Sequence, residues 1–261
     1  MVYYMYSLIH QSIYDDMGLY THCNYIILLQ GKILTIQNIE CEHLGIFKPL
    51  FEHDGFSIDT VLASKERLPD SPQGYNALIV LGGPMSVNDP YDYLREEERL
   101  ILQALNSRMP MLGICLGSQL LAKVINGRVY KGHVKEIGWY TVNLTEHALR
   151  TVFRGLDDRL LVFQWHNDTY DLPDNANISR LAYSSNYSNQ AFIVNNAIGL
   201  QFHVEVDEHM IQDWLEEYSY ELDSSMKDAI LNEVKHKQSM LEHTARVVYR
   251  NFSNMIKYKY K

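Results

Sequence analysis

The chain has 261 residues, of which 46% are hydrophobic and 21% are charged, and its formal net charge at pH 7 is −9. This length is enough to bury a sizeable core, and no apolar run approaches the ~20 residues that a membrane-spanning helix needs. The negative charge would repel nucleic-acid phosphates, so we expect a globular protein that binds neither nucleic acid nor membrane.

Cysteine usage and the first residues indicate the compartment. Cys23, Cys41 and Cys115 are an odd number and show no CxxC spacing. Neither a disulfide framework nor a zinc site is therefore expected. The N-terminus lacks the basic start and the small-residue cleavage site of a secretory signal. These features favour a cytoplasmic protein without a bound metal.

Short apolar runs alternate with longer amphipathic segments from Lys32 onward, which is typical of parallel strands covered by helices. This order predicts an α/β fold with an open, mostly parallel sheet, helices on both faces, and a site at the carboxyl ends of the strands. We expect strands at 32–37, 57–63, 76–83 and 110–114, and helices at 41–55, 91–107 and 117–127.

The second half of the chain is richer in strand patterns and ends in helix from about Asp207. No low-complexity linker or internal repeat divides it, so one domain is favoured over two. We expect this domain at 32–207, with a helical extension at 208–261 packed on it. Residues 1–31 form an N-terminal extension of unclear role, which could add a strand and a helix or precede the true start. Strands are expected at 138–144, 159–165, 178–185, 190–196 and 198–206.

One cysteine stands between two glycines where a predicted strand meets a predicted helix, in the stretch MLGICLGSQLLAK. Gly113 and Gly117 would tolerate the sharp turn of a nucleophile elbow, which holds the side chain of Cys115 clear of the sheet. The following helix N-terminus and a nearby histidine would increase the thiolate fraction of a thiol whose ordinary pKa is about 8.5. A buried structural cysteine is the alternative, but the glycines favour a nucleophile.

A nucleophilic cysteine needs a base, and the chain contains eleven histidines. In the run GLQFHVEV, His203 and Glu205 stand two residues apart in a strand-like pattern, so both side chains can project from one face. Glu205 could then fix the orientation and the tautomer of the imidazole. Such pairs also arise by chance on surfaces, so the spacing alone does not select His203.

Two further stretches contain candidate site residues. LIVLGGPMSV ends a strand at Gly82 and Gly83, and the N–H of one of them could join that of Leu116 in an oxyanion hole. A simple strand-ending turn is the alternative. In FQWHNDTYDLP, His166 is a candidate pocket residue, although a lone histidine there is more often structural or exposed.

Together these stretches resemble the class I glutamine amidotransferase domain, especially its stand-alone members similar to the amidotransferase part of GMP synthetase. The likeness covers roughly residues 32–207 and is weaker in the helical tail. It is carried, in this order, by VLGGPMSV, GICLGSQLLA, KEIGWYTV, FQWHNDTYDLP and GLQFHVEV. The resemblance implies a flavodoxin-like fold and hydrolysis of a γ-glutamyl amide, glutamine to glutamate and ammonia, through a γ-glutamyl thioester. It implies no cofactor.

The resemblance also assigns roles to residues. It implies a catalytic triad of Cys115, His203 and Glu205, and it selects this histidine where spacing did not. It places the oxyanion hole on the backbone of Gly83 and Leu116.

Gln119 would by resemblance help to hold the glutamine substrate, with His166 and Asn167 as further substrate-binding positions. The sequence departs from the family pattern at two places. Val204 stands where many members have proline, which is expected to loosen that turn. Asn167 replaces a common glycine, which puts in doubt a close backbone approach to the substrate there.

Several functions remain open from the sequence. The residues after the triad contain no Gly-rich phosphate loop, so ammonia would pass to a separate synthetase subunit, or the enzyme would act alone as a γ-glutamyl peptidase or hydrolase. A non-catalytic regulatory module on the same fold is a further alternative, which the intact triad disfavours. An esterase of the α/β-hydrolase type is a weaker rival because its nucleophile is usually serine. The oligomeric state is open, with a homodimer as one option.

Overall fold

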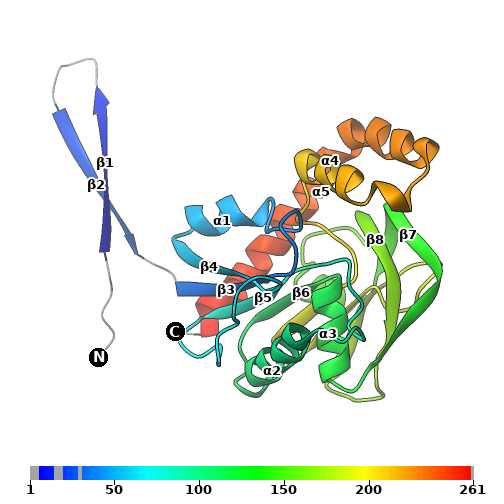
Figure 1. The fold of residues 1–261 in the computed structure, drawn as a ribbon. Coiled ribbons are helices and arrows are strands. Elements are labelled where there is room, and N and C mark those ends of the chain that lie inside the picture. The colour runs from blue at the N-terminus through cyan, green and yellow to red at the C-terminus, as the bar shows by residue number, and fades with distance from the viewer. Residues whose placement is uncertain (1–5, 15–19, 29–30, 260–261) are drawn as a thin grey trace.

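A computed structural model describes the backbone of residues 6–14, 20–28 and 31–259, and the side chains of residues 31–257. Its body is a twisted sheet between two groups of helices (Figure 1). The described elements are, in chain order, β1 (Tyr6–Tyr14), β2 (Tyr20–Leu28), β3 (Gly31–Gln37), α1 (Phe47–His53), β4 (Phe56–Leu62), β5 (Ala77–Val80), α2 (Asp92–Asn106), β6 (Met111–Ile114), α3 (Leu116–Val124), β7 (Arg128–Leu144), η1 (Ala148–Arg150), β8 (Arg159–Asp171), β9 (Ile178–Tyr183), β10 (Ala191–Val194), β11 (Ala197–Leu200), α4 (Glu208–Glu217), η2 (Ser219–Glu221) and α5 (Ser224–Lys259).

The main sheet of the described chain has nine strands in the order β4-β3-β5-β6-β11-β10-β9-β7-β8. Its first five strands are parallel to one another. From β11 onward the pairing is antiparallel, and β7 and β8 form a long ribbon at the far edge. The predicted α/β fold is confirmed, with a mixed sheet whose parallel half carries the cysteine.

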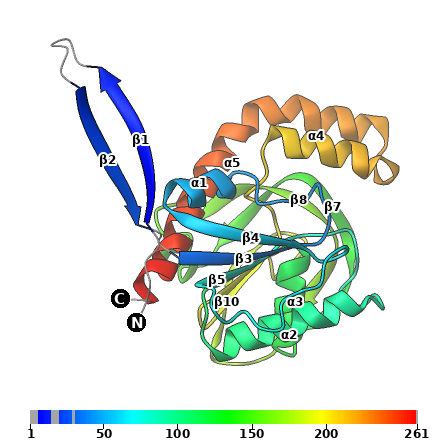
Figure 2. The same cartoon turned by 60° about the vertical axis from the view of Figure 1, so that its left-hand side comes forward.

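Helices cover both faces of the sheet, as the alternation of apolar runs predicts. Successive β3 side chains point to opposite faces, so Ile33 packs in one cluster with α1, α4 and α5, while Leu34 packs in another with α2 and α3. Figure 2 shows α1 and α5 on one side of β3 and β4, and α2 and α3 on the other. Two apolar clusters, one on each face, therefore hold the layers together.

The segment 41–55 is less helical than its pattern indicates. Helix α1 occupies only Phe47–His53, because the residues before it form tight turns. Gly45 has a φ of +47°, and a Cβ there would lie 2.1 Å from the carbonyl oxygen of Glu205. The Ile46 N–H also donates to that oxygen at 2.8 Å. This turn therefore packs directly against the segment that follows β11.

The expected strand at 198–206 is also shorter. Strand β11 ends at Leu200, and the residues after it bend away from the ladder. His203 instead forms an isolated antiparallel bridge with Phe163 of β8, whose N–H donates to the His203 carbonyl at 3.2 Å. The bridge anchors the histidine to the antiparallel half of the sheet.

The C-terminal extension packs on the sheet through α4 and α5. Tyr249 donates to the carbonyl oxygen of Leu50 at 2.8 Å, and Lys257 pairs with Asp54 at 2.8 Å, so α5 is tied to α1.

In residues 1–31, β1 and β2 form a separate antiparallel pair, in place of the strand and helix considered from the sequence.

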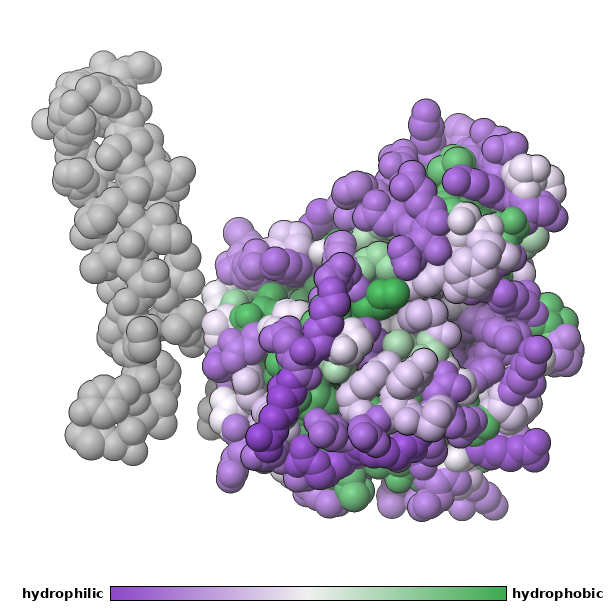
Figure 3. Space-filling view, viewed as in Figure 1, coloured by the Kyte–Doolittle hydropathy of each residue, from purple (hydrophilic) through white to green (hydrophobic). Residues whose placement is uncertain are grey.

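The surface seen in Figure 3 is predominantly polar, with apolar side chains in small separate groups. Within the part of the chain that the structure describes, no helix combines the length and apolar character needed to cross a bilayer.

Candidate active site

Cys115 occupies the junction between β6 and α3, as the elbow interpretation predicts. Its φ of +50° and ψ of −107° lie in a strained region for a residue with a Cβ, and it is the N-cap of α3. Its N–H donates to the Leu200 carbonyl at 2.8 Å, which fixes the turn to β11. The chain thus holds a strained cysteine at a helix N-terminus.

The two flanking glycines are required by close backbone approaches. A Cβ on Gly113 would lie 2.5 Å from the Gly117 carbonyl oxygen, and a Cβ on Gly117 would lie 2.1 Å from the Val80 carbonyl oxygen. The elbow therefore packs backbone against backbone on both sides, which no larger residue permits without movement.

The two residues predicted to form the oxyanion hole, Gly83 and Leu116, are neighbours in the structure. A Cβ on Gly83 would be 3.2 Å from Cδ2 of Leu116, so the turn after β5 and the start of α3 are in contact. Gly83 and Cys115 both line one cavity. This neighbourhood is compatible with two N–H donors serving one oxygen.

His203 and Glu205 form a buried pair beside this turn. Nδ1 of His203 lies 2.7 Å from Oε1 of Glu205, and the two residues are 1% and 2% exposed. Oε2 of Glu205 accepts the N–H of Val204 at 3.0 Å, a bond that proline could not donate. Valine therefore adds a hydrogen bond to this turn that opposes the expected loosening, and the loosening itself stays a prediction.

The protonation of the buried groups follows from burial and charge. Burial raises the pKa of the Cys115 thiol. A hydrogen bond with His203, the charge of His203 and a hydrogen bond from the Leu116 N–H all lower that pKa, but burial has the larger effect. Burial opposes a charged His203, but the charge of Glu205 and hydrogen bonds to Glu205 and Cys115 raise its pKa well above the ordinary value. In the structure the thiol donates to the Trp165 carbonyl at 3.6 Å, as a protonated sulfur can.

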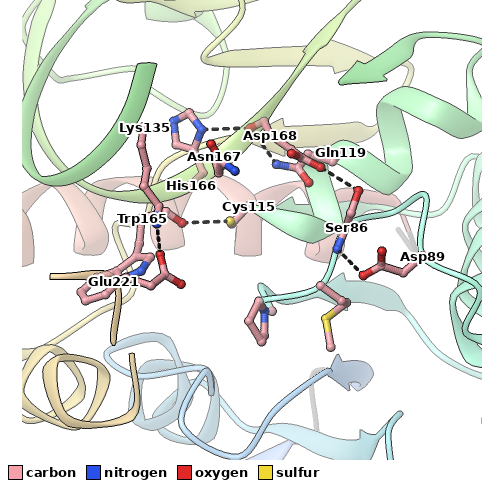
Figure 4. A pocket seen from close by; sticks show the side chains of 13 residues that line it. Ser86, Asp89, Cys115, Gln119, Lys135, Trp165, His166, Asn167, Asp168 and Glu221 are labelled. Carbon is pink, nitrogen blue, oxygen red and sulfur yellow. Dashed lines mark hydrogen bonds and ion pairs between the residues drawn. The ribbon is translucent and has the colours of Figure 1, made fainter. Parts of the chain in front are cut away.

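A cavity of about 310 Å³ opens above Cys115 (Figure 4). Gln119, His166 and Asn167, the predicted substrate-binding residues, all line it. The Gln119 amide nitrogen donates to the Asp168 carbonyl at 3.1 Å, so its side chain ties α3 to the 165–168 segment. The structure therefore gathers these residues around the sulfur.

Comparisons with known proteins identify the family of the chain. The family profile described as "Glutamine amidotransferase class-I" matches residues 51–216. This chain belongs to the class I glutamine amidotransferases. The resemblance seen in the sequence motifs is thereby confirmed, and so is the fold class.

Relatives and solved structures of this family share most of the chain. The glutamine amidotransferase-like protein YfeJ of Salmonella typhimurium is 33% identical over 189 residues, 69% of this chain and 78% of that protein. One subunit of the glutamine-hydrolysing GMP synthase of Sulfolobus acidocaldarius is 34% identical, over 57% of this chain and 77% of that one. The crystal structure of a glutamine amidotransferase from Thermotoga maritima superimposes with a TM-score of 0.78 at 36% identity, covering 85% of this chain and 97% of that one.

In this amidotransferase, His166 has both ring nitrogens engaged by acceptors. Nε2 lies 2.9 Å from Oε2 of the buried Glu136, and Nδ1 lies 2.9 Å from the Asp168 carbonyl oxygen. Burial opposes the charge on Glu136, but hydrogen bonds from His166 and from nearby amides hold its pKa below the ordinary value. His166 therefore shapes the cavity wall, and substrate contact by this residue stays a prediction.

Several residues of the amidotransferase site escape sequence reasoning. The Trp165 carbonyl and the Gln201 amide nitrogen, which lies 3.9 Å from Sγ of Cys115, flank the sulfur. Gln201 lies two residues before His203 in the GLQFHVEV motif, so its place in that motif could have identified it as a site residue. The Trp165 contact is made by the backbone, which sequence does not specify.

The rim of the cavity carries charges that the motifs did not indicate. Lys135 of β7 forms an ion pair with Glu221 of η2, and both line the cavity (Figure 4). On the opposite side the Ser86 hydroxyl donates to Oδ2 of Asp168 at 2.7 Å. Within the described residues no group of three or more His, Cys, Asp or Glu side chains is arranged to hold a metal ion.

Proposed function

We propose that this amidotransferase hydrolyses γ-glutamyl amides, with glutamine as the first substrate, through Cys115, His203 and Glu205. The observation that carries the proposal is the placement of Cys115. It stands on a strained elbow, lines a cavity, and has the buried His203–Glu205 pair behind it. A strained backbone and a buried His–carboxylate pair both cost folding free energy. Such features cluster at functional sites, so together they support catalysis.

In the proposed reaction, the Cys115 sulfur attacks the γ-carbonyl carbon after passing its proton to His203. The N–H groups of Gly83 and Leu116 stabilise the oxyanion of the tetrahedral intermediate. The imidazolium of His203 then protonates the leaving nitrogen, the C–N bond breaks, and the γ-glutamyl thioester remains.

Hydrolysis of the thioester completes the cycle. Neutral His203 takes a proton from water, the resulting hydroxide attacks the thioester carbonyl, and the C–S bond breaks. Glutamate leaves, and the sulfur recovers its proton. Glu205 holds the ring through Nδ1, so Nε2 is left to exchange protons with the sulfur and with water.

Ammonia release from glutamine by the purified chain tests this proposal. Replacing Cys115 with alanine should abolish release, because no other group supplies the nucleophile. Cys23→Ala is the matched control: Cys23 lies in β2, which forms a separate pair with β1, and it should be dispensable. A Cys115→Ala variant that retains most of its activity would sink the assignment.

The acceptor of the ammonia defines the second part of the proposal. In Sulfolobus acidocaldarius, the relative of this chain is one subunit of a glutamine-hydrolysing GMP synthase. We extend that arrangement to this chain, with a separate synthetase as the ammonia acceptor. A partner-dependent subunit should release ammonia from glutamine only slowly when alone, whereas a γ-glutamyl peptidase would cleave γ-glutamyl dipeptides unaided. Assaying both substrates with the purified chain separates these cases.

A non-catalytic module on this fold predicts a different result. A glutamine-analogue affinity label should then leave Cys115 unmodified. Mass spectrometry of the labelled peptide distinguishes this outcome from a catalytic protein that only lacks its partner.

A further inference from the structure

A second buried carboxyl group lies near His203, and the proposed hydrolysis does not use it. Glu42 belongs to the turn between β3 and α1 and is 7% exposed. Its Oε1 accepts a hydrogen bond from the Tyr218 hydroxyl at 2.7 Å. Neither residue lines the cavity, so Glu42 approaches the site from behind.

Glu42 and the imidazole meet at the same glycine. A Cβ on Gly82 would lie 2.0 Å from Oε2 of Glu42 and 3.3 Å from Cε1 of His203. Glu205 already holds the ring at Nδ1. The ring therefore has one carboxylate at Nδ1 and a second carboxyl group near its Cε1 edge, with Gly82 too small to separate them.

The end of helix α4 holds this arrangement in place. Tyr218 is the C-cap of α4, and its hydroxyl also lies 3.6 Å from Sγ of Cys41. Trp214 of the same helix donates to the Cys41 carbonyl at 2.8 Å, and its ring stands 4.7 Å from that of His203. The C-terminal extension thus fixes both the carboxyl group and the imidazole.

The charge of Glu42 changes near neutral pH. Burial raises its pKa to about 7, the charge of His203 and the Tyr218 hydrogen bond lower it, and the charges of Glu205 and Glu221 raise it. The charge of Glu42 is also among the causes that raise the pKa of Cys115, after burial. Cys41, which also faces the Tyr218 hydroxyl, has a pKa raised to about 11, mainly by burial, and stays neutral in this range.

We infer that Glu42 is a positioning residue for His203, which steadies the Cε1 edge of the ring and, through its own ionisation, sets the pH range in which the ring accepts a proton. Its kinetic consequence rests on the proposed hydrolysis, whereas its electrostatic effect on Cys115 does not. When Glu42 ionises, a second negative charge beside the imidazolium holds its proton more firmly. His203 then becomes a base only at higher pH, and thioester hydrolysis needs that base.

The substitution Glu42→Gln tests this inference because it keeps the size of the side chain and removes its charge. Two pH profiles are measured: alkylation of Cys115 by iodoacetamide, followed by peptide mass spectrometry, and kcat for glutamine hydrolysis. In both profiles the pH at which the rate rises should move down by about one unit. The Glu42 carboxylate repels the Cys115 thiolate and attracts the His203 imidazolium, so its loss lowers the pKa of both groups. KM should change little, because Glu42 does not line the cavity.

Tyr218→Phe gives an independent test if Glu42→Gln fails to fold. Without the hydroxyl, Glu42 stays neutral to higher pH, so both profiles should shift in the same direction by a smaller amount. Glu40→Gln is the matched control, since Glu40 lies two residues away, is exposed and pairs with Lys65. Its profiles should coincide with those of the wild type.

The outcomes separate the two proposals. Alkylation profiles of Glu42→Gln and Tyr218→Phe that superimpose on the wild type would overturn the inference. A shifted alkylation profile in a protein whose Cys115 is left unmodified by a glutamine-analogue affinity label would support the role of Glu42 and contradict the proposed function. Shifts in both profiles, absent in Glu40→Gln, would support both.

Discussion

At the scale of single residues, the state of Cys115 is a balance between burial and its neighbours. Burial disfavours the thiolate, while His203 and the Leu116 N–H favour it. The pKa of the thiol therefore lies above its ordinary value, and in the proposed reaction transfer of its proton to His203 activates the sulfur.

This balance predicts the effect of removing the histidine. In His203→Gln, the pKa of Cys115 should rise further, because the charge and hydrogen bond that lower it are lost. Alkylation of Cys115 by iodoacetamide at pH 8 should slow by about tenfold or more, which corresponds to about one pKa unit. His209→Gln is a suitable control, since that side chain is 82% exposed on α4. Equal alkylation rates in both variants would show that His203 does not activate the sulfur.

Gly117 carries a stability prediction. Because a Cβ there would lie 2.1 Å from the Val80 carbonyl oxygen, Gly117→Ala must move β5 or α3 and should cost roughly 1–3 kcal/mol. Urea denaturation measures the loss. A loss well below about 1 kcal/mol would mean that the backbone contact yields easily.

At the scale of elements, α2 contains a buried acidic residue that its amphipathic sequence pattern does not predict. The sequence predicts a helix at 91–107 with a wet acidic face, and α2 does span Asp92–Asn106. Glu97, however, is 0% exposed, and neither of its carboxyl oxygens has a hydrogen-bond partner among the residues that the structure describes. Burial raises its pKa to about 8, against a lowering effect of Asn38.

The raised pKa of Glu97 predicts a pH dependence of stability. The folded protein keeps a proton there up to about pH 8, whereas the unfolded chain releases it near its ordinary value of 4.5. The stabilising contribution is complete below about pH 4.5 and is lost as pH rises to about 8. Glu97→Gln should remove this pH-dependent loss of unfolding free energy, which amounts to roughly 2–5 kcal/mol. The variant should therefore be most stable relative to the wild type above pH 8.

Chemical denaturation at several pH values checks this prediction. Glu96→Gln, the preceding residue on a more exposed face, should follow the wild-type pH dependence. Parallel stability curves for wild type and Glu97→Gln between pH 5 and pH 8 would contradict it.

At the scale of the whole molecule, one apolar cluster joins the C-terminal extension to the sheet. It contains Phe51 of α1, Trp214 of α4 and Phe252 of α5, together with residues of the parallel and antiparallel strands. Removing α4 and α5 would expose this face, so we expect no independent stability for the extension or the sheet without it.

This shared core predicts a single cooperative unfolding transition. Tryptophan fluorescence reports on Trp139, Trp165 and Trp214, the three tryptophans of the chain, while far-UV circular dichroism reports on all helices and strands. The two signals should give coincident midpoints in urea. Separate midpoints would indicate that the extension unfolds by itself.

Much of this architecture was predictable from local pattern. Alternating apolar runs predict the strands from β3 to β6, and the Gly-x-Cys-x-Gly spacing around Cys115 predicts an elbow, because a sharp turn needs residues without side chains at its close approaches. The pairing of His203 with Glu205 was expected from a strand at 198–206, but β11 ends at Leu200 and the pair forms in the segment after it.

The sequence by itself determined the elbow, its cysteine and the family, because each motif that indicates them is a short run of neighbouring residues. Only the tertiary structure decided the antiparallel half of the sheet and the burial of Glu42 and Glu97. Glu42 and Tyr218 stand 176 residues apart in sequence and yet share a hydrogen bond. The charge of an acid depends on how much water and which neighbours surround it, and packing of distant segments sets both.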